Sequence, residues 1–156
     1  MKIYTDGGCA GNPGPGGWAY VIIGDKDPQD KPTIIIEKWG AEKYTTNNRM
    51  ELQAVIAALE TLVELKLSPG NVTVYTDSQY VQKGISIWIH AWKKKAWMTT
   101  GKQPVKNKEL WVRLDALATA FPITWEWVKG HAGDTFNERC DRMAQEAIRS
   151  LSALKI

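Results

Sequence analysis

The order of two hydrophobic periodicities along the chain is the feature that most restricts its fold. Three short apolar runs come first, separated by turn-forming residues, at Lys2–Thr5, Trp18–Ile23 and Thr33–Trp39. Closely spaced strands of this kind favour an antiparallel meander. From Leu52 onward, apolar residues recur at helical spacing, and strand-like and helical patterns then alternate. We therefore expect an α/β fold built on a mixed sheet.

The first predicted helix begins near Asn48, a residue suited to the N-cap, with Glu51 three residues later as in a capping box. The rest of the chain gives the order β-β-β-α-β-α-α-α-β-α, which implies a sheet with helices on its faces. The later predicted elements are a strand at Val72–Thr76, a short helix from Ser78, helices at Ile85–Trp92 and Leu110–Leu117, a strand at Ile123–Val128 and a helix at Met143–Leu151.

Four acidic residues stand in short polar signatures that folding alone does not require. Asp6 follows the first predicted strand and Asp77 the fourth, whereas Glu51 and Asp141 lie on predicted helices. Taken singly, each has a structural explanation: Asp6 as a turn residue, Asp77 as an N-cap, Glu51 in the capping box and Asp141 in a surface ion pair. Parallel pairing of the first and fourth strands would instead bring Asp6 and Asp77 to one sheet edge, where ligands gather in such folds.

A cluster of carboxylates is costly unless cations neutralise it. Oxygen ligands suit Mg²⁺, with Mn²⁺ as the alternative, and two such ions about 4 Å apart would assist phosphoryl displacement. Zinc fits poorly, because His90 and His131 are far apart and the two cysteines, Cys9 and Cys140, lack metal-binding spacing. We therefore predict a magnesium-dependent phosphoryl-transfer site.

His131 is the candidate for moving protons. It lies between glycines in Lys129-Gly130-His131-Ala132-Gly133, which makes the imidazole accessible. The alternative is an ordinary exposed loop histidine. We assign His90 no catalytic role.

The charge of the chain is unevenly distributed. Segment 83–108 contains seven lysines and no acidic residue, so it carries +7 while the remainder of this +3 chain carries −4. Within it, Trp88, Trp92 and Trp97 are interleaved with Lys93–Lys95. Aromatic rings beside a basic run suit a nucleic-acid strand, which offers phosphates and stacking faces. The alternatives are a solvated basic loop and, for Trp88 and Trp92, packing at i, i+4 spacing.

The chain of 156 residues is long enough for one domain, 1–156, with a sizeable core. Its apolar runs fall short of the roughly 18 residues of a membrane span. The N-terminal segment Met1–Asp6 reaches a charge too early for a signal peptide. Cys9 and Cys140 are expected to be free thiols in a reducing compartment. We expect a cytoplasmic monomer that does not associate with membranes.

Six segments together resemble bacterial ribonuclease HI, of the type 1 ribonuclease H family. They are Tyr4–Gly7, Gly11–Gly17, Thr45–Leu52, Thr76–Val81, Trp125–His131 and Asn137–Asp141, and the resemblance runs from about Lys2 to Ser150. It implies a ribonuclease-H-like fold, an α/β fold with a five-stranded mixed sheet and helices on both faces. It also implies endonucleolytic cleavage of the RNA strand of RNA–DNA hybrids, leaving 3′-hydroxyl and 5′-phosphate ends.

The same resemblance assigns roles to individual residues. The implied metal-binding catalytic acids are Asp6, Glu51, Asp77 and Asp141, and His131 is the implied loop histidine that assists proton transfer or product release. A basic protrusion at about 88–107 would grip the hybrid. The implied substrate-binding residues are Trp88, Lys93, Lys94 and Lys95 on that protrusion, Cys9, Asn12, Asn47 and Gln79 near the minor groove, and Thr46 and Asn107 at a DNA-strand phosphate.

The chain departs from the pattern in three places. Tyr44 stands where a basic residue would be expected, Met98 interrupts the basic protrusion, and segment 133–136 is more acidic and aromatic than expected. Two other functions remain open on the residues alone: a DNA-processing enzyme of the same fold, such as a resolvase, and a non-catalytic nucleic-acid-binding module. The complete set of four acids argues against the binding module.

Overall fold

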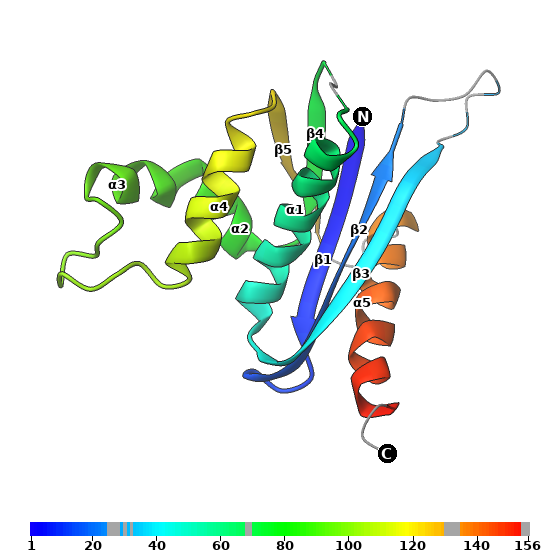
Figure 1. Cartoon of the computed structure of the whole chain (residues 1–156), viewed down its shortest axis with the longest axis horizontal. Helices are drawn as coiled ribbons and strands as arrows, with labels where there is room; N and C mark the ends of the chain where they lie inside the picture. Colours follow the sequence, from blue (N-terminus) through cyan, green and yellow to red (C-terminus); the bar gives the residue numbers. More distant parts are fainter. Residues whose placement is uncertain (25–28, 30, 32, 68–69, 130–134, 154–156) are drawn as a thin grey trace.

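The structure, a computed structural model, describes residues 1–24, 29, 31, 33–67, 70–129 and 135–153 (Figure 1). Its strands are β1 (Lys2–Cys9), β2 (Gly14–Ile23), β3 (Ile34–Thr45), β4 (Val72–Thr76) and β5 (Ile123–Trp127). Its helices are α1 (Asn47–Glu64), α2 (Gln79–Lys83), the π-helical turn η1 (Gly84–Trp88), α3 (Ile89–Lys94), α4 (Lys108–Ala118) and α5 (Thr135–Ala153).

The five strands form one mixed sheet in the order β3-β2-β1-β4-β5. The meander β1-β2-β3 is antiparallel, whereas β4 and β5 run parallel to β1. Figure 1 shows α1 and α4 on one face of the sheet and α5 on the other. The predicted five-stranded mixed sheet with helices on both faces is confirmed.

Each face of the sheet has its own core, because successive residues of a strand point to opposite faces. Ile3 of β1 belongs to the core under α1 and α4, where Trp111 is fully buried. Its neighbour Tyr4 belongs to the core under α5, together with Cys140 and Ala144. The central strands are therefore buried on both sides, which fixes their register and holds both helical layers against one sheet.

The first two strands are longer than their apolar runs predict. The glycine- and proline-rich segment 7–17 was expected to be a turn, but β1 continues to Cys9 and β2 begins at Gly14. Gly7 pairs with Trp18 and Gly8 with Gly17, so cross-strand hydrogen bonding overrides the low strand propensity of glycine. The expected end of β3 at Trp39 is likewise too early, because the strand runs on to Thr45.

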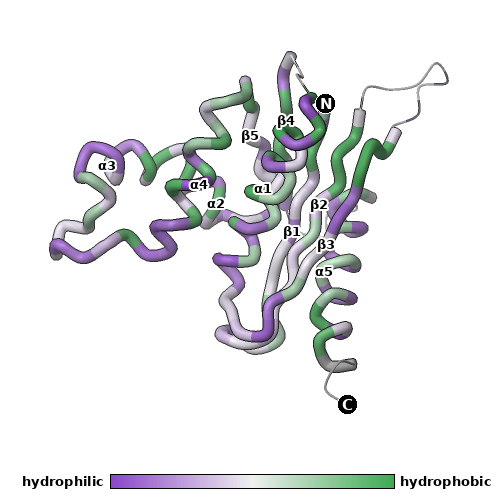
Figure 2. Tube along the Cα trace, viewed as in Figure 1, coloured by the Kyte–Doolittle hydropathy of each residue, from purple (hydrophilic) through white to green (hydrophobic). Residues whose placement is uncertain are grey.

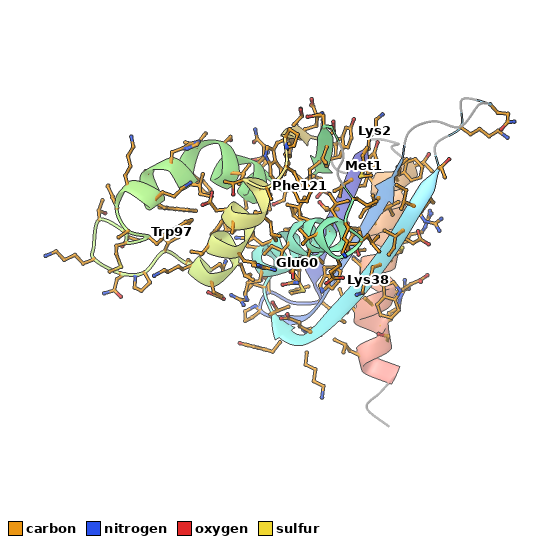
Figure 3. All side chains as sticks on the ribbon, turned by 45° about the horizontal axis from the view of Figure 1, so that its top comes forward. Met1, Lys2, Lys38, Glu60, Trp97 and Phe121 are labelled. Carbon is orange, nitrogen blue, oxygen red and sulfur yellow. The ribbon has the colours of Figure 1, made fainter. Side chains whose placement is uncertain are left out.

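A helical extension leaves the sheet between β4 and α4. Figure 1 shows α3 and the segment after it standing away from the strands, and Figure 2 shows hydrophilic residues recurring along this part. Trp97, labelled in Figure 3, lies within it. In the part of the chain that the structure describes, every helix is too short or too polar to pass through a bilayer.

Candidate active site

Strand pairing brings Asp6 and Asp77 together. Tyr4 of β1 lies opposite Tyr75 of the parallel strand β4. Asp6 follows Tyr4 by two residues, and Asp77 follows Tyr75 by two residues. Parallel pairing of these two strands, the condition for bringing the two acids to one sheet edge, is thus met. Asp6 nevertheless lies inside β1, not at its end, while Asp77 follows the end of β4. The structural alternative for Asp77, an N-cap, is wrong, since Ser78 caps α2 by accepting a hydrogen bond from Val81 N.

Helix α1 supplies Glu51. The helix is capped by Thr46, whose Oγ1 accepts from Arg49 N at 3.3 Å, so the expected cap at Asn48 is wrong by two residues. The predicted capping box of Asn48 and Glu51 therefore does not form. Oε1 of Glu51 accepts instead from Gly7 N of β1 at 2.8 Å. Its Oε2 is buried and has no hydrogen-bond partner among the described residues.

Helix α5 supplies Asp141. Its neighbour Cys140 is fully buried against β1, where Sγ donates to Tyr4 O at 3.4 Å. The Glu37 carboxylate of β3 accepts two hydrogen bonds from the Arg139 guanidinium. These contacts of the two residues before Asp141 hold the first turns of α5 on the sheet. Asp141 lines the same cavity as the other acids, and the structural alternative, a surface ion pair of Asp141, is not found among the described residues.

The four acids line one cavity of about 290 Å³. Single carboxylate oxygens of Asp6, Glu51 and Asp77 all lie within 4.8 Å of one another. Asp141 lines the same cavity and acts on the Asp6 carboxyl, but it stands outside this closest group of three. We call these four residues the acidic cluster.

Burial and mutual repulsion disfavour the charged form of the acidic cluster. Asp6 and Glu51 are only 7% and 8% exposed. Burial, followed by the charge of Asp77, raises the pKa of Asp6 to about 8. Burial, followed by the charges of Asp6 and Asp77, raises the pKa of Glu51 well above its usual range. Without a cation, the cluster therefore holds protons near neutral pH.

This cluster fits a divalent cation by three observations. Its donors are all carboxylate oxygens, which hard cations prefer. Three of them are close enough to share one ion, and Glu51 Oε2 is buried without a hydrogen-bond donor. A bound cation would replace the protons that the raised pKa values otherwise keep on the cluster.

His131 and its flanking glycines lie outside the described residues. The strand that leads toward this loop ends at Trp127, whose Nε1 donates to Asp77 O at 3.2 Å. Trp127 was expected to be only structural. Its hydrogen bond places the start of the loop beside the acidic cluster.

Three of the predicted minor-groove residues are joined by hydrogen bonds. Asn47 Oδ1 accepts from Cys9 N at 2.7 Å, and Asn12 Oδ1 accepts from Asn47 N at 3.1 Å. They connect the β1–β2 turn to the start of α1, directly beside Glu51. Gln79, the fourth, lies exposed at the start of α2. The fold thus gathers the first three, and Gln79 follows Asp77 by two residues.

The predicted phosphate pocket contains a basic residue, Arg49, that is absent from the predicted substrate-binding residues. Thr46 caps α1 and Asn107 precedes α4, and both hydrogen-bond to Arg49. Arg49 Nη1 donates to Asn107 Oδ1 at 3.1 Å and pairs with Glu109 at 2.6 Å. Arg49 thus brings a positive charge to Asn107. Its position inside the matched segment Thr45–Leu52 was the available signal.

Tyr80 supports this pocket from α2. Its hydroxyl accepts from Asn107 Nδ2 at 3.2 Å and from Trp111 Nε1 at 2.9 Å. Asn107 adopts a positive φ of 61°, an uncommon conformation for a non-glycine residue. The two hydrogen bonds of its side chain amide, one to Arg49 and one to Tyr80, hold it there.

The basic protrusion is built on aromatic rings that pack in tilted and edge-on pairs. Trp92 packs edge-on against Trp111 of α4, with ring centroids 5.4 Å apart, and contacts Trp88 and Trp97. The packing alternative is therefore correct for Trp92, whereas Trp88 is 37% exposed. The rings fix the protrusion against α4, so that it presents its charged side chains on a rigid support.

The three adjacent lysines of the protrusion are exposed but not equivalent. Lys93 Nζ lies 3.3 Å from Asp115 Oδ2 on α4. Lys94 and Lys95 form no ion pair with the described residues. They are the better placed of the three to meet an anionic ligand.

Comparison with known proteins identifies the family. The RNase H family model matches residues 1–149. The ribonuclease H of Treponema denticola is 50% identical over 161 residues, covering 97% of this chain and 98% of the relative. That of Bradyrhizobium diazoefficiens is 53% identical over 149 residues, covering 95% of this chain and 89% of the relative.

Solved structures of ribonucleases H have the same fold as this chain. LC9-RNase H1, described as a type 1 RNase H with the type 2 active-site motif, superposes with a TM-score of 0.84 at 30% identity, over 96% of this chain and 72% of its own. LC11-RNase H1 in complex with an RNA/DNA hybrid gives a TM-score of 0.72 at 27% identity, over 97% of this chain and 98% of its own. The chain therefore belongs to the ribonuclease H family.

Proposed function

We propose that this enzyme cleaves the RNA strand of RNA–DNA hybrids endonucleolytically, leaving 3′-hydroxyl and 5′-phosphate ends, with Mg²⁺ or Mn²⁺ as its cofactor. The observation that carries the proposal is the acidic cluster, in which oxygens of Asp6, Glu51 and Asp77 lie within 4.8 Å of one another. It is supported by membership of the ribonuclease H family and by the hybrid-bound structure of LC11-RNase H1.

Asp6, Glu51 and Asp77 would hold a cation, and Asp141 would extend the site toward a second one. Bound divalent cations would neutralise the carboxylates, promote ionisation of a water and stabilise charge on the scissile phosphate. The Gly7 N–H keeps the Glu51 side chain turned into the cavity. Burial of Asp6 and Glu51 limits competing water in the site.

His131 would assist proton transfer or product release from the loop between β5 and α5. An imidazole is suited to this step because it exchanges protons near neutral pH. We expect His131→Ala to lower kcat by about 10²-fold, as for many general acid–base groups, with little change in magnesium affinity. Loss of magnesium binding in a calorimetric titration would make His131 a metal ligand instead.

The hybrid would lie along the face that carries these residues. Cys9, Asn12, Asn47 and Gln79 would approach the wide minor groove, where the 2′-hydroxyl distinguishes RNA from DNA. Thr46 and Asn107, with Arg49, would bind a phosphate of the DNA strand. Trp88 and Lys93–Lys95 would hold the backbone further along, without reading sequence.

We further propose that residues 1–156 form a single ribonuclease H domain that acts as a monomer in the cytoplasm, where it does not associate with membranes. Both cysteines are free, as the sequence predicts, and Cys140 is buried against β1. Free thiols are usual in reducing compartments.

The proposal is tested by cleavage of three substrates side by side: RNA–DNA hybrid, duplex DNA and duplex RNA. We expect only the hybrid to be cut, in its RNA strand, with magnesium and not with a chelator. Cleavage of duplex DNA would favour the resolvase-like alternative. Hybrid that binds but survives magnesium unchanged would favour a non-catalytic binding module.

A further inference from the structure

Two glycines lie where helix backbones press against the sheet beside the acidic cluster. A Cβ atom on Gly7 of β1 would lie 2.4 Å from Met50 C and 2.7 Å from Glu51 N of α1. A Cβ atom on Gly17 of β2 would lie 2.4 Å from the carbonyl oxygen of Ala144 on α5. These separations are far below an ordinary contact of about 3.4 Å. In both places, therefore, a helix approaches the sheet as closely as glycine alone permits.

The two contacts lie on opposite faces of the sheet. Gly8 pairs with Gly17 across β1 and β2, and Gly7 is the residue before Gly8, so their missing side chains would point to opposite sides. Gly7 faces the helix that carries Glu51. Gly17 faces the helix that carries Asp141, one turn before Ala144.

Both helices bring an acid toward Asp6, which lies next to Gly7 in β1. The obstructing atoms belong to helix backbone, so changing a rotamer cannot relieve an added methyl group. The helix would have to move outward by about 1 Å, the difference between 2.4 Å and an ordinary contact. A displacement of this size at a catalytic group can cost on the order of 10²-fold in rate.

We infer that Gly7 and Gly17 are positioning residues, which set the distances of Glu51 and Asp141 from Asp6 by determining how closely α1 and α5 approach the sheet. This inference rests on the proposed function. It predicts different defects for the two glycines. Gly7 controls a member of the closest group of three acids, whereas Gly17 controls the acid outside that group.

The test compares Gly17→Ala and Gly7→Ala with the wild-type enzyme. Gly17→Ala should lower kcat on RNA–DNA hybrid by about 10²-fold while leaving KM and calorimetric Mn²⁺ binding to the remaining acids near wild type. Gly7→Ala should weaken Mn²⁺ binding itself, because it displaces Glu51. A folded Gly17→Ala variant with wild-type kcat would overturn the inference.

Gly40→Ala is the matched control. A Cβ atom there would also overlap its surroundings, at 2.4 Å, but the obstructing atoms belong to the Trp18 ring on β2. This variant should lose stability and keep kcat and Mn²⁺ binding. An equal loss of kcat in Gly40→Ala and Gly17→Ala would mean that Gly17 has only a structural role.

Ala147→Ser keeps the inference testable if Gly17→Ala does not fold. Ala147 is fully buried on α5, and its Cβ faces Gly17 at 3.1 Å from the added atom. One extra oxygen should lift α5 less, with a smaller loss of kcat and an unchanged KM. Unchanged kcat in this variant would count against the inference. Failure of the wild-type enzyme to cleave hybrid would instead overturn the proposed function.

Discussion

At the scale of single residues, burial and mutual repulsion of the carboxylates in the acidic cluster destabilise the folded protein, and a bound cation is expected to reduce this cost. Asp6 keeps a proton to about pH 8, chiefly because it is buried and then because Asp77 lies beside it. The pKa of Glu51 is also raised, by burial and then by the charges of Asp6 and Asp77. The cluster is thus a place where function opposes stability, as is common at active sites.

Removing one charge should separate activity from stability. We expect Asp77→Asn to abolish magnesium-dependent cleavage of hybrid while the protein stays folded. Without metal at pH 8, its Tm should rise by about 2–4 °C for each kcal/mol of repulsion removed. Cleavage assays and thermal melts measure the two effects. Glu64→Gln, at the far end of α1, is the control that should change neither, and near-normal cleavage by folded Asp77→Asn would contradict the assignment.

The metal-free protein should also lose stability as the pH rises. The folded state holds the Asp6 proton to about pH 8, whereas the unfolded chain releases it near 3.8. Since the folded state binds more protons within this window, the Asp6 contribution is complete below about pH 4 and is lost as the pH approaches and passes 8.

Urea unfolding in chelator from pH 5 to 8.5 measures this dependence, with Asp6→Asn as the reference. The difference in unfolding free energy between the two proteins should shift in favour of Asp6→Asn as the pH rises. Magnesium should reduce the wild-type loss at pH 8. A difference that does not change with pH would show that Asp6 is not buried against other charges.

At the scale of elements, the basic protrusion and the pocket before α4 are held by different forces. Tryptophans in tilted and edge-on contact support the protrusion, whereas hydrogen bonds through Tyr80 support Asn107. Substitutions in the two elements should therefore affect hybrid binding in different ways.

Lys94 and Lys95 should contribute salt-dependent affinity. Replacing both with serine is expected to raise KM more than it lowers kcat. Each lost phosphate contact should flatten the slope of log affinity against log salt by roughly 0.7–0.9. Lys93→Ser should have a smaller effect, because Lys93 already pairs with Asp115.

Binding is measured on the inactive Asp77→Asn background across a salt series. Lys66→Ser, on the loop after α1, is the control for general loss of charge. An unchanged slope in the double variant would show that the two lysines are only solvated and that the hybrid is held elsewhere.

Tyr80→Phe should weaken hybrid binding without removing a group that we assign to the hybrid. The variant lacks the hydroxyl oxygen that accepts hydrogen bonds from Asn107 and Trp111. A bond worth about 1 kcal/mol corresponds to a roughly five-fold change in affinity. Tyr20→Phe, which loses a buried hydroxyl contact with Thr61, should lower stability but keep affinity. Equal affinity in both variants would mean that Tyr80 does not organise the pocket.

At the scale of the whole molecule, one sheet separates two cores that depend on each other. Residues of β1 and β2 alternate between the core under α1 and the core under α5. Neither core has its own sheet, so loss of one exposes the strands that support the other.

Thermal unfolding of the metal-free protein should therefore be a single transition, with equal calorimetric and van't Hoff enthalpies. Calorimetry and circular dichroism at two wavelengths would check this. Two separated transitions would show that the protrusion or α5 melts as an independent unit, and would contradict the proposal of one domain.

The sequence by itself determined the order of strands and helices and the ribonuclease H family, and it named the four acids that the fold brings to one cavity. It could do so because apolar periodicity reports which side of an element is buried, and because the four acids stand in segments that together resemble one family. The N-cap of the first helix is predicted two residues too late, at Asn48 in place of Thr46. The sequence names parallel pairing of the first and fourth strands as the condition that would bring Asp6 to Asp77, and the fold meets it.

Only the tertiary structure decided how these pieces meet. The sequence predicts a turn at Gly7 and Gly8, but cross-strand pairing places both in β1. It also predicts a capping box with Glu51, but the N-cap of α1 is Thr46. Nothing local in the sequence relates Arg49 to Asn107, which is 58 positions away. Local propensities are worth about 1 kcal/mol or less, so contacts between distant segments decide their outcome.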